Sequence, residues 1–346
     1  MNPRAPVPSV ARGAAASAFH EGERAVQERA GVREKIAGPG LRMIRDFMPD
    51  EHRELFERLP YVVVGAQDGA GAPWATILAG APGLMVTPDA RTIVVRARPL
   101  AGDPAAPLLA EGKRAALLGI ELATRRRNRV NGRVVAANER GFAVEVDQSF
   151  GNCPQYIQRR AFAPQGDARR PARAYAEGAL LSDEALDAIA RADTFFIASA
   201  SRRAADAADR DRREGLDVSH RGGRSGFVRA TVEDGATVLT WPDFRGNYMF
   251  NTLGNLAVEP RAGIVVPDFA RGALLTLTGR ADVVWSGAEL AAFRGAERLV
   301  RLRVASGARL DGAIPPSLDK EDAPQLAKTG SWADVAAALA EGDAPR

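Results

Sequence analysis

An internal repeat constrains the fold of this chain more than any other feature of its sequence. Arg114–Leu122 is similar to Arg261–Phe269, and the offset between them is 147 residues (261 − 114 = 147). Asn131–Val134 and Thr278–Ala281 show the same offset. A shared order at a constant spacing is the mark of duplicated structural units. The sequence therefore predicts two similar units in tandem.

Each unit is expected to be built mainly from β-strands. Short apolar or β-branched runs such as Tyr61–Ala66 and Trp74–Leu78 are separated by Gly, Pro and Asp. One helix is expected to cross each unit. In the first it starts at Asp103-Pro104, a good N-cap and first turn, and runs to about Glu111. Antiparallel strands with one crossing helix favour a closed or split barrel. The predicted fold is mainly β (α+β), with two tandem split β-barrels and inserted and flanking helices.

Composition changes along the chain predict the domain boundaries. A stretch rich in Pro, Arg and Ala at 162–176 is typical of a linker, and Ser182–Arg191 has the pattern of a helix capped by Ser182. The expected division is a tail and helix at 1–45, a first split barrel at 46–160, a linker and helix at 161–190, a second split barrel at 191–304 and a C-terminal tail at 305–346.

Composition also narrows the function. The 47 basic residues nearly balance 43 acidic ones, and a basic stripe with interleaved aromatics is missing outside the segment described next, so no nucleic-acid partner is expected. No apolar run approaches the roughly 20 residues of a membrane span. A single cysteine excludes an internal disulfide and favours a reducing compartment, the cytoplasm. Three scattered histidines without metal-ligand spacing predict no metal site.

The most informative segments are 216–230 and 240–256, which are rich in arginine, glycine and asparagine. Arginine offers a forked donor to an anion, glycine lets backbone N–H groups approach it, and a helix N-terminus adds partial positive charge. Interleaved aromatic residues distinguish these segments from a solvated loop. We expect a phosphate pocket at the junction of Arg245-Gly246 with a helix at 247–257. Arg229 could face the same phosphate or be an exposed strand residue.

Other polar groups leave two interpretations open. Asn251 and Asn255 lie four residues apart, so they could contact a ligand or each other. The arginine-rich run at 125–129 could be a solvated connection or could supply cations to a ligand between the barrels. Cys153 is either a small buried residue or part of a site, and His20 beside Glu21 and Glu23 is a weak indication of acid–base chemistry. The chain has no GxGxxG, Walker A or GxSxG motif.

Taken together, six segments resemble the pyridoxamine 5′-phosphate oxidase-like, FMN-binding split-barrel superfamily, and in particular its tandem-barrel branch. They are Phe19–Glu23 with Gln27, Thr124–Gly132, Gly151–Gln158, Ser219–Val228, Pro242–Leu256 and Gly295–Val300.

The resemblance implies that the second barrel binds FMN at an interface between barrels. The phosphate would be held by Arg229 and by the turn of Arg245, Gly246 and Asn247. The flavin ring would lie beside Trp241. The remaining cofactor-binding residues implied or proposed are Arg221, Gly226, Phe227, Val228, Thr240, Pro242, Asn251, Asn152 and Gln155. The first barrel lacks an Arg-Gly-Asn turn at 98–102, which predicts one flavin per chain.

The function implied is that of an FMN-dependent oxidoreductase acting on an unassigned small molecule. Electrons would pass through flavin N5 and come from NAD(P)H or a separate reductase, and the resemblance also implies a homodimer. His20 and Cys153 are the candidate catalytic side chains. The Trp/Arg substrate signature of true pyridoxamine-phosphate oxidases is not recognisable near the C-terminus, which argues against that substrate. The alternative is a non-catalytic flavin, haem or deazaflavin binding protein, in which His20 or His220 would have to ligate a haem.

Overall fold

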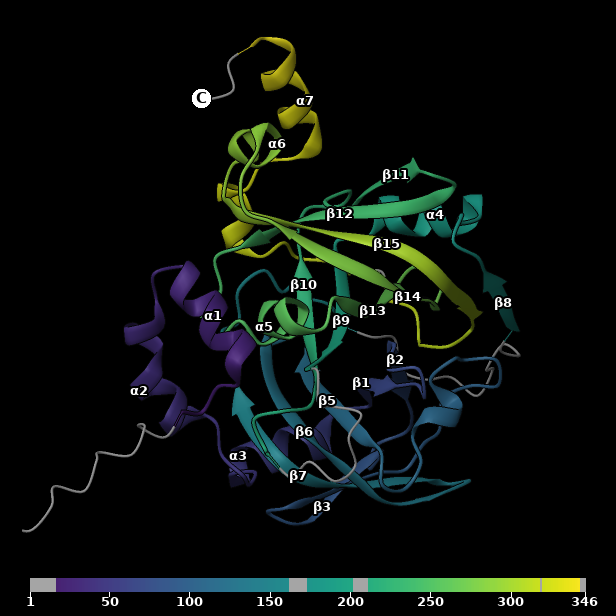
Figure 1. Cartoon of the computed structure of the whole chain (residues 1–346). Coiled ribbons are helices and arrows are strands. Elements are labelled where there is room, and N and C mark those ends of the chain that lie inside the picture. Colours follow the sequence, from purple (N-terminus) through teal and green to yellow (C-terminus); the bar gives the residue numbers. More distant parts are fainter. Residues whose placement is uncertain (1–16, 162–172, 202–210, 318, 343–346) are drawn as a thin grey trace, which may run out of the picture.

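The protein consists mainly of β-strands arranged in two antiparallel sheets, with helices at their margins (Figure 1). The computed structural model describes residues 17–161, 173–201, 211–317 and 319–342. This architecture confirms the predicted mainly β, α+β class with two sheet units. Most of the expected N-terminal tail (1–16) and of the expected linker (162–172) lies outside the described residues.

The first sheet has seven strands in the order β2-β1-β5-β6-β7-β4-β3. The strands are β1 (Tyr61–Gln67), β2 (Pro73–Ala79), β3 (Met85–Asp89), β4 (Thr92–Val95), β5 (Arg114–Glu121), β6 (Arg126–Asn138) and β7 (Gly141–Gly151).

The second sheet follows the order β10-β9-β13-β14-β15-β12-β11, which is the order of the first sheet with each strand number raised by eight. Its strands are β9 (Thr194–Ala200), β10 (Leu216–Gly222), β11 (Arg229–Glu233), β12 (Ala236–Phe244), β13 (Arg261–Asp268), β14 (Ala273–Val284) and β15 (Ala296–Asp311), and β8 (Arg173–Glu177) pairs with β15. The register corresponds too, since Arg114 pairs with Arg133 and Arg261 pairs with Arg280. The two sheets thus share strand order and register at the spacing of the sequence repeat, while their origin by duplication stays a prediction.

The two sheets pack directly against each other through β1, β2 and β5 of one and β9, β10 and β13 of the other. Their shared apolar layer includes Val63, Phe196 and Val265. The approach is close at Gly263, where an added Cβ would lie 2.3 Å from the carbonyl oxygen of Pro73, so only glycine fits. This packing fixes the position of each sheet relative to the other, and with it any site between them.

Seven α-helices are described: α1 (Glu21–Arg29), α2 (Arg33–Met43), α3 (Asp50–Arg58), α4 (Asp183–Arg191), α5 (Asn251–Val258), α6 (Ala288–Ala292) and α7 (Trp332–Ala340). Helix α1 packs against α5 and α3 packs against the first sheet, whereas α6 and α7 stand together at the far end of the second sheet (Figure 1). None of the described helices has the length and apolar character needed to cross a membrane.

The structure corrects the prediction at two places. The helix expected from Asp103 to about Glu111 is only a 3-10 turn at Ala106–Leu108. Pro107 lacks the N–H that a continuing helix needs, and the side chain of Asp103 accepts a 2.5 Å hydrogen bond from Thr76. The expected domain boundary at residue 304 also falls inside a strand. Strand β15 continues past residue 304 to Asp311, and the chain then forms a 3-10 turn at Pro324–Lys328 and the helix α7.

Candidate functional site

A polar cavity lies between the two sheets, and we call it the arginine hollow. It has a volume of about 100 Å³. Its walls come from β6, from the segment after β7, from β10, from the segment that joins β12 to α5, and from β15. The lining residues are Arg127, Arg129, Asn152, Cys153, Gln155, Tyr156, Ser219–Gly222, Asp243, Phe244, Gly246–Tyr248, Phe250–Leu253 and Arg298.

The segment between β12 and α5 forms one wall because its backbone turns sharply. Tyr248 and Phe250 both have left-handed backbones, with φ of 63° and 59°. The side chain of Asn247 accepts a 3.1 Å hydrogen bond from the amide of Met249 and so holds this turn together. Helix α5 then begins at Asn251 without a side-chain cap, and its first residues line the hollow. The N-terminus of α5 thus adds partial positive charge to the cavity.

Positive charge exceeds negative charge among the enclosed side chains. Arg129 forms a 2.7 Å ion pair with Asp217, and Arg298 lies 2.9 Å from Asp243. Arg221 is only loosely paired, because its Nε lies 3.8 Å from Asp243. Arg127 has no carboxylate within ion-pair distance among the described residues; its Nη2 donates to the carbonyl of Cys153 at 2.6 Å.

The pKa values of the two weakly paired arginines reflect this imbalance. Burial, together with the nearby charges of Arg129 and Arg221, lowers the pKa of Arg127 to about 9. Burial also lowers the pKa of Arg221, with Arg129 and Arg298 adding to the effect and Asp243 opposing it. Removing a cation from water is unfavourable unless an anion compensates, so these side chains are poised to accept a negatively charged ligand.

Several buried polar atoms around the hollow make no hydrogen bond within the described part of the chain. They are the Nε atoms of Arg127, Arg129 and Arg221, Nε2 of His220, both amide atoms of Asn152, and Oε1 of Gln155. Buried polar groups in folded proteins nearly always find partners. Their concentration around one cavity therefore marks it as a binding site for a polar ligand.

His220 is the one histidine that borders the hollow. It is buried, its ring meets Phe196 edge-on at 5.7 Å, and its Nε2 has no partner among the described residues. Burial and the surrounding arginines lower the pKa of His220 well below its ordinary value. The imidazole is therefore neutral at physiological pH, so it can offer a hydrogen bond or a lone pair but no charge.

A wider groove continues outward from the hollow, and we call it the outer groove. It has a volume of about 630 Å³ and shares four lining residues with the hollow, namely Arg127, Asn152, Cys153 and Asn247. The other lining residues are Met43, Arg45, Thr124–Arg126, Asn128, Gly151 and Pro154. The two arginine-rich cavities thus adjoin each other, and Cys153 lines both.

Six of the fourteen predicted cofactor-binding residues line the hollow: Asn152, Gln155, Arg221, Gly246, Asn247 and Asn251. Asn251 does not bond Asn255. Instead its side chain accepts from Arg129 at 3.0 Å and donates to Glu23 at 2.6 Å, while Asn255 donates to the carbonyl of Ser199.

The predicted phosphate ligand Arg229 lies elsewhere. Its guanidinium forms two hydrogen bonds to Glu289, at 2.7 and 2.8 Å, and stacks 4.0 Å from the ring centre of Trp332. The indole of Trp332 in turn donates to the carbonyl of Phe227 at 2.9 Å. The side chain of Arg245 bonds the hydroxyl of Tyr248 and does not line the cavity. Arg229 and Arg245 therefore do not line one cavity in this structure, and the expected pairing of the two around a phosphate gains no support from its geometry.

The residues expected beside the flavin ring also lie outside the cavity lining. Trp241 and Phe227 pack against Phe195 in the core of the second sheet, with Trp241 fully enclosed. The others that do not line the hollow are Gly226, Val228, Thr240 and Pro242. Thr240, Trp241 and Pro242 lie in the continuously buried part of β12, and only Asp243 and Phe244 at the end of this strand reach the hollow.

The two candidate catalytic residues have different surroundings. Cys153 is half-buried at the junction of the hollow and the outer groove. His20 does not line the hollow. It caps helix α1, where its Nδ1 accepts a 3.1 Å hydrogen bond from the amide of Gly22. A helix-capping role explains His20 better than a catalytic one.

Four charged residues that line the hollow were not among the predicted cofactor-binding residues: Arg127, Arg129, Asp243 and Arg298. The arginine-rich run at 125–129 carried a signal for the first two, because cations between the barrels were one of its two interpretations. Asp243 and Arg298 face each other through the pairing of β12 with β15, which no local pattern reveals.

Comparisons with known proteins do not identify the chain. No protein-family model and no curated protein matches it. Among solved structures, it is similar to HupZ of Group A Streptococcus (13% identity, 36% of this chain and 90% of that chain, TM-score 0.27). It is also similar to HutZ, the heme storage protein from Vibrio cholerae (15%, 37% and 93%, TM-score 0.24), and to an FAD-binding protein from Mesorhizobium loti (12%, 41% and 99%, TM-score 0.25). Likenesses at this level carry no conclusion about function.

Proposed function

We propose that this protein binds FMN between its two sheets and acts as an FMN-dependent oxidoreductase. The observation that carries the proposal is the arginine hollow, with its excess of buried cations and its cluster of unpartnered polar atoms. The family resemblance of the surrounding segments supplies the identity of the cofactor.

The charge of the hollow suits a phosphate monoester. Four arginines (127, 129, 221 and 298) face the enclosed carboxylates of Asp217 and Asp243, which leaves two positive charges. Glu297 also contacts Arg298, but its carboxylate is more than one-third exposed and is screened by water. A phosphate monoester carries about −1.5 to −2 at neutral pH and would balance this excess.

The size of the two adjoining cavities suits the rest of the FMN molecule. The hollow is large enough for a phosphate and part of its chain, and the outer groove falls in the range of about 300–1,000 Å³ typical of ligand sites. In this arrangement Arg127 and Arg221 would hold the phosphate, and Asn152 and Gln155 would offer hydrogen bonds to the polar parts of the cofactor. These proposed contacts differ from those expected from the sequence, which assigned the phosphate to Arg229 and Arg245.

Bound FMN would supply reversible transfer of a hydride or of single electrons. The protein would orient the cofactor and hold neutral His220 and the thiol of Cys153 beside the cavity. The small-molecule substrate, a supply of electrons from NAD(P)H or a separate reductase, a homodimeric assembly and a cytoplasmic location remain predictions from the sequence.

A non-catalytic binding protein is the second candidate, and one observation favours haem as its ligand. The unpartnered Nε2 of His220 belongs to a neutral imidazole, which is the form that ligates iron. The surplus of arginines suits a haem as well, since its propionate carboxylates also pair with arginine, so it is the family resemblance of the surrounding segments that favours the flavin.

The absorption spectrum of the purified protein separates these candidates. Twin flavin bands, either as purified or after adding FMN, support the proposed function, and a Soret band supports the haem alternative. The affinities of FMN and riboflavin then test the role of the arginines. FMN should bind about 100-fold more tightly than riboflavin if two charge-assisted contacts hold its phosphate. Equal affinities would show that the hollow does not bind the phosphate.

A further inference from the structure

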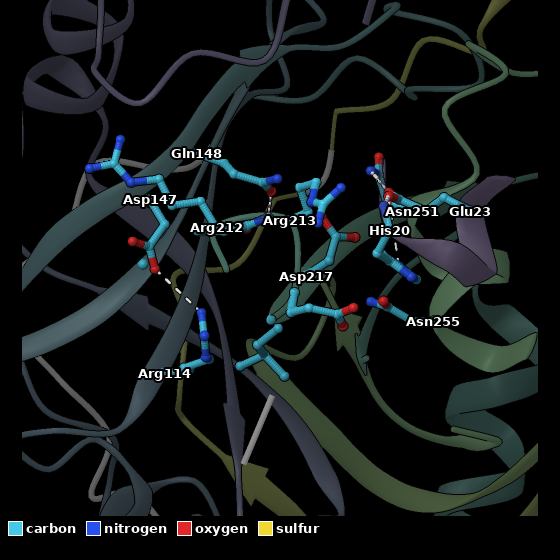
Figure 2. A pocket seen from close by; sticks show the side chains of 15 residues that line it. His20, Glu23, Arg114, Asp147, Gln148, Arg212, Arg213, Asp217, Asn251 and Asn255 are labelled. Carbon is cyan, nitrogen blue, oxygen red and sulfur yellow. Dashed lines mark hydrogen bonds and ion pairs between the residues drawn. The ribbon is translucent and has the colours of Figure 1, made fainter. Parts of the chain in front are cut away.

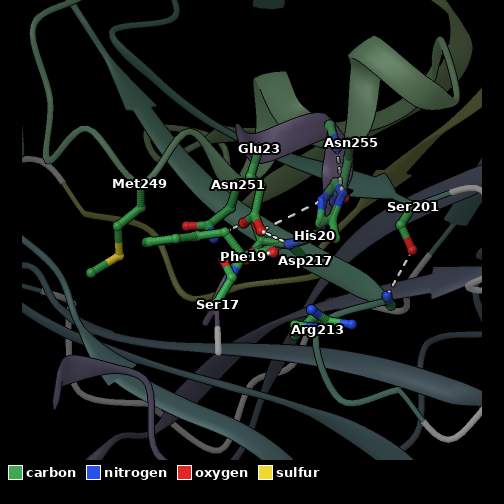
Figure 3. A network of polar contacts seen from close by, with 12 residues as sticks. Ser17, Phe19, His20, Glu23, Ser201, Arg213, Asp217, Met249, Asn251 and Asn255 are labelled. Atoms are coloured by element: carbon green, nitrogen blue, oxygen red, sulfur yellow. Dashed lines mark hydrogen bonds and ion pairs between the residues drawn. The ribbon is translucent and has the colours of Figure 1, made fainter. Parts of the chain in front are cut away.

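A buried carboxyl group lies directly behind the arginine hollow. Glu23, on α1, is 4% exposed and contacts the first turn of α5. The side chain of Asn251 donates to Glu23 at 2.6 Å (Figure 3). The same side chain accepts from Arg129 at 3.0 Å. Because Arg129 lines the hollow, two hydrogen bonds connect this carboxyl group to the proposed phosphate site.

The backbone prevents Glu23 from moving away from this position. Helices α1 and α5 touch at Gly22 and Gly254. A Cβ added at Gly254 would lie 2.6 Å from the backbone nitrogen of Glu23, and one added at Gly22 would lie 2.1 Å from the carbonyl oxygen of Gly254. The carboxyl group is also tied to its own helix, since it accepts a 2.9 Å hydrogen bond from the amide of His20. Its distance from Asn251 is thus fixed by main-chain packing.

Among the described residues, only His20 lies within ion-pair distance of the Glu23 carboxyl group. The ring of His20 is 3.7 Å from the carboxyl group, but burial lowers the pKa of His20, so the ring is neutral. Arg129 is engaged by Asp217. Burial raises the pKa of Glu23 to about 8, more strongly than the hydrogen bonds from His20 and Asn251 lower it, and Asp217 and Glu214 raise it further.

Water can reach this carboxyl group from a small polar chamber on its other side. The chamber has a volume of about 20 Å³, which is enough for one water molecule. Glu23, Asn251 and Asn255 line one side of it and Arg114 with Asp147 the other (Figure 2). The charged groups that complete its lining are Arg212, Arg213, Glu214 and Asp217. Protons can therefore exchange between Glu23 and solvent without passing through the hollow.

We infer that Glu23 is a proton-holding residue that sets the affinity of the arginine hollow for an anion. When Glu23 holds its proton and is neutral, it does not offset the positive charge that the arginines present to the ligand. When the proton leaves, a second buried carboxylate adds to Asp217 beside Arg129 and opposes the anionic ligand. Glu23 acts through Asn251 and Arg129, so it is a positioning residue and not a catalytic one. This inference rests on the anion-binding part of the proposed function.

The direction of the effect follows from linkage. An anion in the hollow disfavours ionisation of Glu23, so ligand binding raises the pKa of this group and is accompanied by proton uptake. Affinity must then fall as the pH rises through about 8. The size expected for one charge at this separation is about five- to tenfold. The phosphate of FMN itself titrates near pH 6 and is already a dianion in this range.

The test is a pair of pH titrations on the full-length protein, with FMN as the probe. We expect wild-type affinity to fall about five- to tenfold between about pH 7 and pH 9.5, and the Glu23→Gln variant to lack this step. Glu21→Gln is the matched control, because Glu21 is an exposed carboxylate on the same helix. Any contribution from Arg127, whose pKa is lowered by burial, is common to all three proteins, so the difference between Glu23→Gln and wild type isolates Glu23. Coinciding profiles would overturn the inference.

A second measurement needs no variant and separates this inference from the proposed function. The ¹³C NMR spectrum of wild-type protein with labelled glutamate carboxyl groups should contain one resonance that titrates near pH 8. Inorganic phosphate should raise its midpoint. If FMN fails to bind at every pH, the proposed function is rejected, but the shift caused by inorganic phosphate still decides the inference. A midpoint that phosphate does not move, or the absence of such a resonance, would overturn it.

Discussion

Replacing Arg127 by methionine should have opposite effects on stability and on ligand binding. The guanidinium is surrounded by two other arginines, makes one hydrogen bond to the carbonyl of Cys153 and has no carboxylate partner within the described residues. Methionine keeps the apolar length of the side chain while removing the charge. We therefore expect Arg127→Met to stabilise the unliganded protein and to weaken FMN binding.

The magnitudes follow from the lowered pKa. The lowering of the pKa of Arg127 to about 9 corresponds to roughly 5 kcal/mol of unfavourable interaction of the charged form. Arg127 keeps partial contact with solvent, which screens about half of this, and the lost hydrogen bond returns about 1 kcal/mol. The net gain in the free energy of unfolding should be about 1–2 kcal/mol. Loss of a charge-assisted contact with the phosphate should weaken FMN binding about 10- to 100-fold.

Two measurements on the same protein check this prediction. Urea unfolding followed by tryptophan fluorescence gives the change in stability, and quenching of flavin fluorescence gives the change in FMN affinity. Arg140→Met is the control, since Arg140 is an exposed arginine outside the cavity lining, and it should change neither quantity. A less stable Arg127→Met protein that still binds FMN as tightly as wild type would refute the reasoning, because Arg127 would then be a structural residue.

Three further outcomes follow from the structure. Arg229→Met should leave FMN affinity within about twofold of wild type. Its free energy of unfolding in urea should fall by about 1–2 kcal/mol, because the contacts with Glu289 and Trp332 are broken. A large loss of FMN affinity would show that Arg229 belongs to the binding site. Gly263→Ala should lower the free energy of unfolding by about 3 kcal/mol or more, because its Cβ would collide with the facing strand; near-wild-type stability would contradict the described packing of the sheets. Because the pKa of Glu23 is raised in the folded state, its contribution to stability is fully present below about pH 4.5 and is lost as the pH rises through about 8. In pH-dependent urea unfolding, the free energy of unfolding of Glu23→Gln should therefore increase relative to that of wild type across this range. Parallel curves for the two proteins would contradict the raised pKa of Glu23.

The sequence predicted those elements whose signals are local. The repeat at a spacing of 147 residues corresponds to two sheets of the same strand order, and helix α4 begins after Ser182, whose hydroxyl accepts from the amide of Ala185 as expected of an N-cap. Helix α2 was missed because Gly38, Pro39 and Gly40 argue against a helix. Gly40 is needed there because an added Cβ would lie 2.4 Å from the ring of Phe19.

The site was only partly predictable, because its residues are brought together by long-range packing. The alternation of polar and apolar residues places Arg229 on an exposed side of its strand, but nothing local shows that Glu289 and Trp332 engage it. Arg129, in contrast, lines the hollow, and its ion-pair partner Asp217 lies 88 residues away in the sequence. The sequence thus supplied six of the residues that line the hollow, whereas Arg229 and Arg245, to which the sequence analysis assigned the phosphate, do not line it.

The most direct test of the account is a crystal structure of the protein with FMN bound. We predict that the phosphate lies in the arginine hollow, within hydrogen-bond distance of the guanidinium groups of Arg127 and Arg221, and that the ring extends toward Cys153 and the outer groove. A phosphate bound between Arg229 and Arg245, with the ring beside Trp241, would contradict the account.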